Sequence, residues 1–272
     1  MRLTKYCALG NDYWVVDPVE KKHLPIKTVQ FLCHRHQGLG GDGVLQGPVF
    51  VDKTSYGLKI WNADGSLAPI SGNGLTIFAR YLADKYLDED TAHITLMPSK
   101  FCQVACQITP HYIELQLGLA TLRSKKLYEV PKTIKSTFDL PDILPIFEVD
   151  IGNPHCVVPV KKPSPALAKT LGPLLEKHPW FPNKTNVQFV HFYRQNRGKI
   201  EIWERGSGYT LGSGSSACAV AFIYGLLFDL TTYSVCLTMP GGKLQVNCDH
   251  GRCSFRNQAH RVIEIEAACG WS

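Results

Sequence analysis

A corner of small polar residues precedes a helix in the first half of the chain. Apolar side chains recur at helical spacing from Leu75 to Leu82, directly after a Ser-Gly-Asn-Gly sequence that starts at Ser71. Ser71 stands at the expected N-cap, and the glycines after it leave the first backbone N–H groups of the helix open to an anion. The same residues are also typical of an ordinary cap and turn, so this corner alone does not establish a binding site.

Short apolar runs separated by turn residues predict β-strands around this helix. We expect two strands between residues 3 and 17, and further strands at 56–61, 91–97, 103–108 and 112–118. A second helix is predicted over residues 23–35. The composition of segment 120–145 shifts toward Lys, Thr and Pro, and we expect this segment to be a linker or a crossing between lobes.

The pattern of the first half returns in the second half at one constant spacing. Ser213-Gly214 repeats Ser71-Gly72 at an offset of 142 residues, since 213 − 71 = 142, and both pairs open a helix-like run. The same offset joins Asn11 with Asn153, Ile60-Trp61 with Ile202-Trp203, Met97-Pro98 with Met239-Pro240, and Gln103-Val104 with Gln245-Val246. An offset without gaps over most of each half indicates two copies of one fold.

The repeat predicts an α+β fold of two pseudo-symmetric lobes. Each lobe is expected to be a mostly antiparallel β-sheet or barrel around one central helix that begins at a Ser-Gly corner. We place the N-terminal lobe at 1–118 and the C-terminal lobe at 119–260. The tail, 261–272, is expected to return to the N-terminal lobe. A pseudo-twofold axis between the lobes would make the two corners face each other across a cleft.

Composition narrows the class of protein. The chain has 272 residues, a net charge of +6 with scattered Lys and Arg, and ten cysteines. The start of the sequence lacks the features of a signal peptide, so we expect a reduced, cytoplasmic, soluble protein rather than a disulfide-rich one. Neither a membrane nor a nucleic-acid partner is expected. Cys102 and Cys106 have no matching pair at zinc-finger spacing, so no metal is predicted.

A symmetric cleft of this kind suits one type of chemistry. Two helix N-termini can together hold a carboxylate, and matched side chains can act on opposite faces of the carbon beside it. One base and one acid in that arrangement catalyse racemisation or epimerisation. Asn11 and Asn153 would anchor polar groups of the ligand. Arg205 would clamp a carboxylate, although Glu204 and Arg205 together are equally typical of a surface ion pair.

Seven motifs make the chain similar to the diaminopimelate epimerases, and they follow one another in that family's order. They are Leu9-Gly10-Asn11-Asp12, Arg35-His36-x-Gly38-x-Gly40-x-Asp42, Asn62-Ala63-Asp64-Gly65-Ser66, Gly72-Asn73-Gly74, Gly152-Asn153-Pro154-His155, Thr185-Asn186-Val187 and Trp203-Glu204-Arg205-Gly206. The resemblance implies a two-lobed homodimeric isomerase of lysine biosynthesis. It would interconvert LL- and meso-diaminopimelate by a two-base mechanism that needs no pyridoxal phosphate or other cofactor.

The resemblance also implies a set of site residues. The proton-transfer pair falls at Ser71 and Ser213, and His155 and Glu204 would support that pair. The substrate contacts would be Asn11, Asn62, Gly72, Asn73, Asn153, Asn186, Glu204, Arg205, Gly214 and Ser215.

The sequence departs from the family where the chemistry takes place. The family has cysteine at both positions that are Ser71 and Ser213 here. Tyr209 replaces a usual Glu, and Gly43 stands where some members carry a substrate-contacting Gln. A serine hydroxyl does not approach the anion population of a thiol near a helix N-terminus. We therefore expect binding with little or no turnover. A racemase or isomerase for another amino acid, and a non-catalytic amino-acid-binding protein, remain alternatives.

Overall fold

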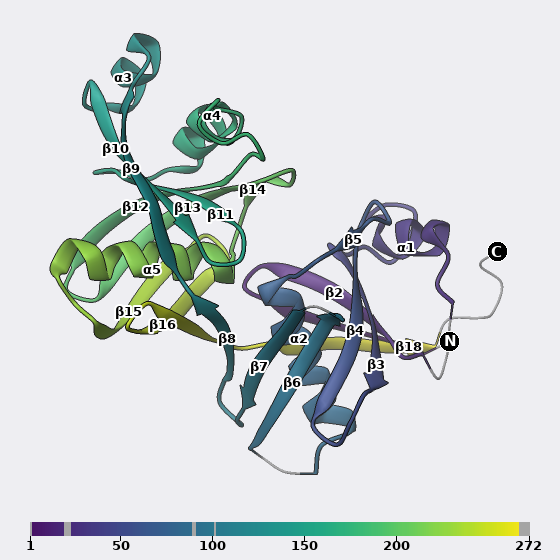
Figure 1. Cartoon of the computed structure of the whole chain (residues 1–272). Helices are drawn as coiled ribbons and strands as arrows, with labels where there is room; N and C mark the ends of the chain where they lie inside the picture. The colour runs from purple at the N-terminus through teal and green to yellow at the C-terminus, as the bar shows by residue number, and fades with distance from the viewer. Residues whose placement is uncertain (1, 19–22, 89–90, 101, 267–272) are drawn as a thin grey trace. The chain divides into compact units, whose positions relative to one another are not determined.

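The chain divides into two compact units. The computed structural model describes residues 2–18, 23–88, 91–100 and 102–266 (Figure 1). Unit 1 contains the described residues up to Leu115 and those from Arg256 onward, and unit 2 runs from Gln116 to Phe255. These divisions lie a few residues before the expected ones at 118 and 260. Of the expected tail, 261–266 belongs to unit 1, and 267–272 lies outside the described residues.

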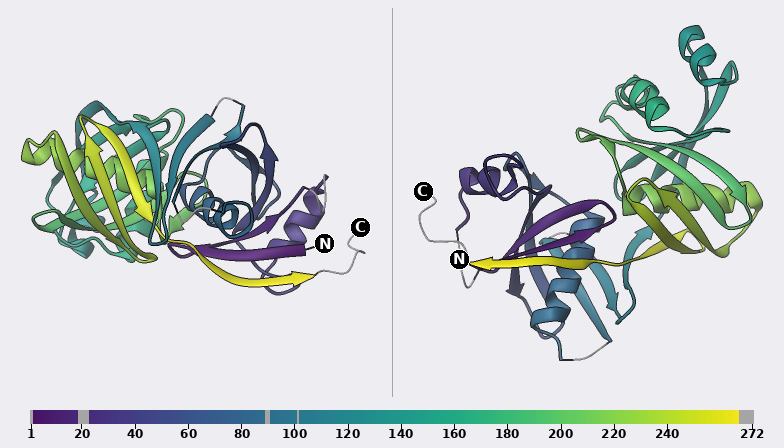
Figure 2. Two further views of the ribbon diagram at one scale, coloured as in Figure 1. Left: turned by 90° about the horizontal axis from the view of Figure 1, so that it is seen from below. Right: turned by 180° about the vertical axis from the view of Figure 1, so that it is seen from behind.

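Unit 1 is a mixed sheet wrapped around one helix. Its elements are β1 (Arg2–Ala8), β2 (Asn11–Val16), α1 (Ile26–Cys33), β3 (Gly43–Phe50), β4 (Ser55–Asn62), β5 (Leu67–Ala68), α2 (Gly72–Lys85), β6 (Ala92–Ser99), β7 (Cys102–Ile108) and β18 (His260–Glu266). β1 lies antiparallel between β2 and β18, and β2 pairs in parallel with β3. Figure 2 shows these strands curving around α2, with β1 and β18 side by side in both views.

Unit 2 repeats this arrangement. Its elements are β9 (Thr121–Glu129), α3 (Lys132–Phe138), β10 (Ile143–Asp150), β11 (Pro154–Pro159), α4 (Pro165–Glu176), β12 (Asn186–Arg194), β13 (Arg197–Glu204), β14 (Gly208–Thr210), α5 (Gly214–Phe228), β15 (Thr232–Met239) and β16 (Gly242–Asp249). β10 lies antiparallel between β9 and β11, and β11 pairs in parallel with β12. The chain enters unit 2 along β8 (Ile113–Leu119) and leaves it along β17 (Arg252–Asn257).

The pairing scheme confirms the predicted fold class of two similar α+β lobes. Antiparallel β3–β4 and parallel β4–β6 in unit 1 correspond to antiparallel β12–β13 and parallel β13–β15 in unit 2. α2 begins at Gly72 and α5 at Gly214, which is the offset of 142 residues seen in the sequence. In each unit the remaining pairs are mostly antiparallel, because consecutive strands are joined by short turns.

Most residues of each central helix are buried. α5 is apolar on all its faces, as expected of a helix enclosed by strands rather than lying on a surface. Gly214 is required at its first position, because a Cβ there would lie 2.5 Å from the Phe255 ring. None of the helices in the described residues is long and apolar enough to span a membrane.

Two predictions of secondary structure are wrong. Segment 120–145 is not a linker: it forms β9, α3 and the start of β10 inside unit 2. Its Lys and Thr residues lie in β9 and α3, and most side chains of both elements are exposed or half-buried. Helix α1 covers Ile26–Cys33 rather than residues 23–35, because Pro25 disfavours helical backbone in the residue before it.

Candidate functional site

The two central helices begin in the same way. Ser71 and Ser213 are the N-cap residues of α2 and α5, and both have extended backbone. Ser71 Oγ accepts a hydrogen bond from Gly74 N at 3.1 Å, and Ser213 Oγ accepts one from Ser216 N at 3.4 Å. Both predicted acid/base positions therefore lie at the positive end of a buried helix, where negative charge is stabilised.

In unit 1, both ends of the Asn11 amide are hydrogen-bonded within the protein. Asn73 Nδ2 donates to Asn11 Oδ1 at 2.6 Å, and Asn11 Nδ2 donates to Asp42 Oδ2 at 2.9 Å. Tyr13 OH lies 3.4 Å from Ser71 Oγ. The half-site of unit 1 therefore consists of Ser71 with Tyr13 on one side and a fixed pair of asparagines on the other.

Charged residues hold the Asn11 loop in place. Arg35 pairs with Asp12 and with Asp42, both at 2.7 Å, and Lys5 Nζ lies 2.7 Å from Asp12 Oδ2. Burial acts to raise the pKa of Asp12, but hydrogen bonds from Arg35 and Lys5 outweigh it and lower the pKa to about 2. Both partners thus keep Asp12 ionised, and the loop that carries Asn11 is anchored by a charged network.

Asn62 stands apart from these contacts. It is exposed at the end of β4, and its Nδ2 donates to Ser66 Oγ at 2.9 Å within its own turn. Gly43, at the start of β3, has no room for a side chain: a Cβ there would lie 2.2 Å from Trp61 O and 2.6 Å from the Tyr13 ring. The glutamine that some family members carry at this position therefore has no equivalent space here.

In unit 2, a buried chain of hydrogen bonds leads from helix α5 to Asn153. Gln188 Nε2 lies 3.0 Å from Ser216 Oγ and 3.0 Å from His155 Nδ1. His155 Nε2 lies 3.0 Å from Asn153 Oδ1. His155, Gln188 and Ser216 are completely buried. Burial lowers the pKa of His155 to about 4, so the imidazole is neutral near pH 7.

Glu204 lies beside the second serine. It is half-buried, and Thr210 Oγ1 donates to its Oε2 at 3.2 Å. Burial raises the pKa of Glu204, while hydrogen bonds from Ser213 and Thr210 act in the opposite direction. A carboxyl group with a raised pKa next to a helix N-cap is typical of a proton-handling site.

Asn186 organises the loop that carries Arg205. Its Oδ1 accepts from Arg205 N at 3.0 Å, and its Nδ2 donates to Pro154 O at 3.0 Å. The Arg205 side chain is exposed, with Nη1 3.3 Å from Asn183 O. Within the described part of the chain, Arg205 makes no ion pair with Glu204. The alternative of a simple Glu204–Arg205 surface pair is therefore wrong, and the guanidinium is available to a ligand.

The structure gathers the remaining predicted residues at the same places. Gly72 and Gly214 are the first residues of α2 and α5, and Ser215 Oγ lies 3.5 Å from Ser213 Oγ. Tyr209, which replaces a usual Glu, donates to Glu201 Oε2 at 2.7 Å, and Lys169 Nζ lies 4.9 Å from its ring centroid. Tyr209 is thus tied to neighbours in unit 2.

Several residues that contact the predicted site were not predicted from the sequence, among them Tyr13, Asp42, Gln188 and Ser216. The repeat contained a signal for the first, since Tyr13 and His155 are 142 residues apart. Gln188 follows the Thr-Asn-Val motif by one residue and shares the inward face of β12 with Asn186. Its contact with His155 depends on the parallel register of β11 and β12, which no local pattern reveals.

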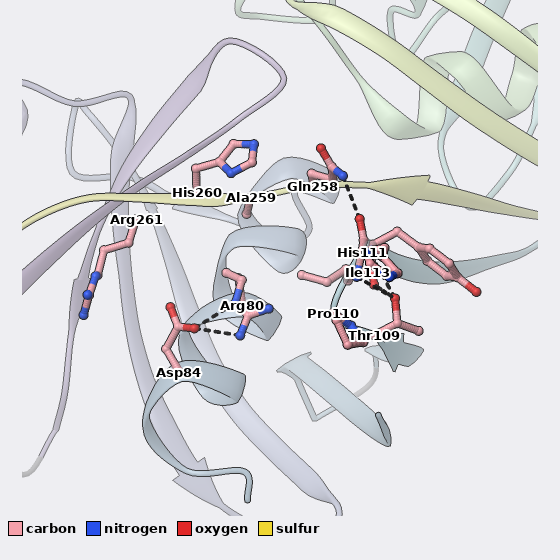
Figure 3. A pocket seen from close by; sticks show the side chains of 11 residues that line it. Arg80, Asp84, Thr109, Pro110, His111, Ile113, Gln258, Ala259, His260 and Arg261 are labelled. Atoms are coloured by element: carbon pink, nitrogen blue, oxygen red, sulfur yellow. Dashed lines mark hydrogen bonds and ion pairs between the residues drawn. The ribbon is translucent and has the colours of Figure 1, made fainter. Parts of the chain in front are cut away.

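A cavity of about 600 Å³ in unit 1 contains none of the predicted site residues. Figure 3 shows its lining, with Arg80 and Asp84 joined on α2 and Gln258 donating to the backbone of His111. Asp84 also accepts from Tyr6 OH at 2.8 Å. Within the described residues, no cluster of three His, Cys, Asp or Glu side chains is arranged to hold a metal ion.

Solved structures define the class of fold. The chain matches a phenazine biosynthesis protein of the PhzF family from Bacillus anthracis with a TM-score of 0.72 and 15% identity, covering 98% of this chain and 99% of that one. It matches a hydroxyproline epimerase from Agrobacterium vitis, solved with bound trans-4-hydroxy-L-proline, with a TM-score of 0.70 and 12% identity, covering 97% and 91%. The two-unit fold is therefore the one these proteins share.

Sequence relatives define the family within that fold. The diaminopimelate epimerase family model matches residues 3–121 and 147–255. Diaminopimelate epimerase 2 of Nostoc sp. is 37% identical over 90% of this chain and 88% of that protein. The diaminopimelate epimerase of Desulfitobacterium hafniense is 34% identical over 90% of each. The chain belongs to the diaminopimelate epimerase family.

Proposed function

We propose that this chain binds diaminopimelate at its two serine-capped helices. The reaction supported is epimerisation at the α-carbon of LL-diaminopimelate to the meso form, without a cofactor. We further propose that Ser71 and Ser213 leave this chain inactive or strongly impaired. The observation that carries the proposal is the pair of matched N-caps, because each places a side-chain oxygen at the end of a buried helix dipole.

The chemical argument concerns the two caps. A thiol with an ordinary pKa of about 8.5, lowered at a helix N-terminus, supplies a useful thiolate population near pH 7. A serine hydroxyl is a far weaker acid and needs a strong adjacent base. Tyr13 beside Ser71 is not such a base, and the Glu204 carboxylate beside Ser213 remains much weaker than an alkoxide. Ligand binding should survive because oxygen and sulfur occupy similar positions, whereas proton abstraction should fail.

The substrate contacts follow from groups that the fold leaves available. The Arg205 guanidinium suits one carboxylate of the ligand, and the first backbone N–H groups of the helices, at Gly72 and Gly214, suit an oxyanion. Asn62, Asn73, Asn153, Asn186 and Ser215 complete the proposed contacts. Asn11, with both ends of its amide engaged, is proposed to act through Asn73.

The decisive test is the double substitution Ser71→Cys with Ser213→Cys. We expect it to restore exchange of the α-proton of diaminopimelate into deuterated water, followed by NMR or mass spectrometry, at a rate far above that of the present chain. A double variant that exchanges no faster than the present chain would overturn the assignment of the acid/base pair. A Ser136→Cys variant, which adds a thiol at an exposed position of helix α3 away from the proposed contacts, is the matched control.

The two alternatives are separated by ligand selectivity. A panel of amino acids, including hydroxyproline because a fold relative binds it, can be screened by thermal shift. A selective shift with diaminopimelate supports the main proposal, and a selective shift with another amino acid supports a different racemase. A selective shift combined with no exchange in the cysteine variant supports a non-catalytic binding protein.

The proposal extends to the setting of the protein. We propose a cytoplasmic homodimer that acts in lysine biosynthesis, on the basis of family membership. Light scattering of the purified chain at micromolar concentration tests the dimer: a monomeric mass would contradict it.

A further inference from the structure

Gln188 is the one buried side chain in the described residues whose polar atom has no partner. Its Oε1 is enclosed without a hydrogen bond, while its Nε2 makes two. We infer that Gln188 is a positioning residue that holds His155 in the Nε2–H tautomer, so that Asn153 presents its amide N–H to a ligand carboxylate. This inference rests on the proposed function for the identity of the ligand.

The tautomer follows from the donors and acceptors around the ring. An amide nitrogen can only donate, so the His155 Nδ1 atom that faces Gln188 Nε2 must accept. A neutral imidazole carries its proton on the other nitrogen, which here is Nε2. Nε2 lies 3.0 Å from Asn153 Oδ1, an acceptor, and donates to it. Each contact in the chain from Gln188 to Asn153 therefore pairs one donor with one acceptor.

Ser216 fixes the orientation of the glutamine. The second N–H of Gln188 Nε2 donates to Ser216 Oγ in the first turn of α5. The same residue donates its backbone N–H to Ser213 Oγ. A buried carbonyl without a partner is unfavourable, and the two hydrogen bonds from Nε2 offset that cost. The start of helix α5 thus fixes the orientation of the Gln188 amide, and that orientation in turn fixes the tautomer of the His155 imidazole.

The His155 tautomer determines which end of the Asn153 amide is bound and which end is left for a ligand. With Oδ1 bound by His155, the donor end of the amide, Nδ2, has no partner among the described residues, and the side chain is only half-buried. A free N–H donor matches a carboxylate. In unit 1 the corresponding amide nitrogen, Asn11 Nδ2, is already bound by Asp42. Asn153 is therefore the asparagine of the matched pair whose amide nitrogen is not held by a partner among the described residues.

The substitution Gln188→Glu reverses this polarity with almost no change in shape. A carboxylate accepts only, so it requires a proton on His155 Nδ1. In the neutral Nδ1–H tautomer, Nε2 becomes an acceptor, and Asn153 must turn its Nδ2 toward the ring. Its Oδ1 then faces the ligand carboxylate and repels it. If His155 is instead protonated on both ring nitrogens, Nδ1 again carries a proton. This form therefore also differs from the unsubstituted chain, in which Nδ1 is unprotonated.

The test is the ¹⁵N spectrum of histidine-labelled full-length protein without ligand near pH 7.5. His155 is assigned by the signal lost in His155→Gln. We expect the unsubstituted chain to show protonated Nε2 and unprotonated Nδ1, and Gln188→Glu to show protonated Nδ1. Protonated Nδ1 in the unsubstituted chain overturns the inference, even if Gln188→Glu does not fold. So does a folded Gln188→Glu variant with an unchanged tautomer. Because no ligand is present, this result is independent of the proposed function.

A binding measurement then connects the tautomer to the ligand. We expect Gln188→Glu to weaken calorimetric binding of diaminopimelate by roughly tenfold or more, since a donor is replaced by a repelling acceptor. The matched control is Gln46→Glu, at the equivalent position 142 residues earlier, where the side chain accepts from Trp61 Nε1. Equal losses in the two variants would count against the inference. Absence of binding by the unsubstituted chain would instead defeat the proposed function.

Discussion

The half-sites at Ser71 and Ser213 share a backbone but differ in the forces that hold the neighbouring asparagine. In unit 1, ion pairs among Asp12, Arg35 and Asp42 fix the loop of Asn11 at the protein surface. In unit 2, a neutral chain through Gln188 and His155 fixes Asn153 from the buried side. The first arrangement is charged and partly exposed, and the second is uncharged and dry.

This difference shows what a repeated fold preserves. The cap geometry is common to both units because a short antiparallel strand, β5 or β14, precedes each helix and a Ser-Gly pair begins it. The surrounding side chains have diverged, with Tyr13 at the place equivalent to His155. As a result, both ends of the Asn11 amide are bound within unit 1, whereas only the oxygen of the Asn153 amide is bound within unit 2. Two units of one repeated fold can therefore differ in the chemistry around equivalent helix caps.

The largest expected effect is on the epimerisation rate, when cysteine is placed at one or both of the caps Ser71 and Ser213. If one thiol abstracts the proton and the other delivers one, neither Ser71→Cys nor Ser213→Cys alone should restore full exchange and epimerisation. We expect the double variant to exceed each single variant on the order of a thousandfold in epimerisation rate, within the range for general acid–base catalysis. Measurement of meso-diaminopimelate formed from the LL isomer checks this. A single variant as active as the double one would show that only one half-site carries the chemistry.

Acid should weaken the two units in different pH windows. His155 has a pKa of about 4 in the folded chain, against an ordinary value of 6.5. Between these values the unfolded chain binds a proton that the folded chain does not. Stability should therefore fall by up to about 3 kcal/mol as the pH drops from 6.5 to 4, and level off below. Asp12, with its pKa lowered to about 2 from 3.8, loses its contribution only as the pH falls through that lower range.

Urea unfolding between pH 7 and about pH 2 measures these slopes. His155→Gln should remove the slope between pH 6.5 and 4 and leave the lower one in place. Asp12→Asn should leave the upper slope unchanged. A His155→Gln variant with the full upper slope would assign that slope to another group.

The next effect concerns the affinity for diaminopimelate and the role of Arg205 in unit 2. Arg205→Ala should weaken diaminopimelate binding roughly tenfold, which corresponds to the loss of a hydrogen-bonded charge pair with a carboxylate. The control is Lys132→Ala, which removes an exposed lysine on helix α3 that is not among the proposed contacts, and it should change the affinity little. Isothermal titration calorimetry distinguishes the two, and similar losses would count against the guanidinium clamp.

The smallest expected effect is on stability, when the capping hydroxyl of either central helix is removed. Ser71→Ala and Ser213→Ala should each cost about 1 kcal/mol of stability, because each removes the acceptor for one backbone N–H at a helix start. Thermal unfolding checks both values. Since the two caps share one geometry, similar losses are expected, and a large difference would show that the surroundings outweigh the cap.

The sequence predicted the parts of this fold that local patterns govern. The offset of 142 residues, the Ser-Gly corners and most strands follow from periodicity and turn residues, and the structure places α2 and α5 at those corners. Segment 120–145 was misjudged because a solvent-facing strand and a linker have the same polar composition. Helix α1 was predicted too long because the spacing of apolar residues does not register the backbone restriction imposed by Pro25.

The site shows the same division between local and distant information. The sequence alone determined that serine occupies both cap positions, and that asparagines recur beside them. Only the tertiary structure decided which asparagine has its amide nitrogen bound within its own unit. That outcome depends on the parallel pairing of β11 with β12, which brings Gln188 to His155 across 33 residues of sequence, and on the ion pairs that bring Asp42 to Asn11. Hydrogen-bond polarity is set by all the partners around a group, and those partners are distant in sequence.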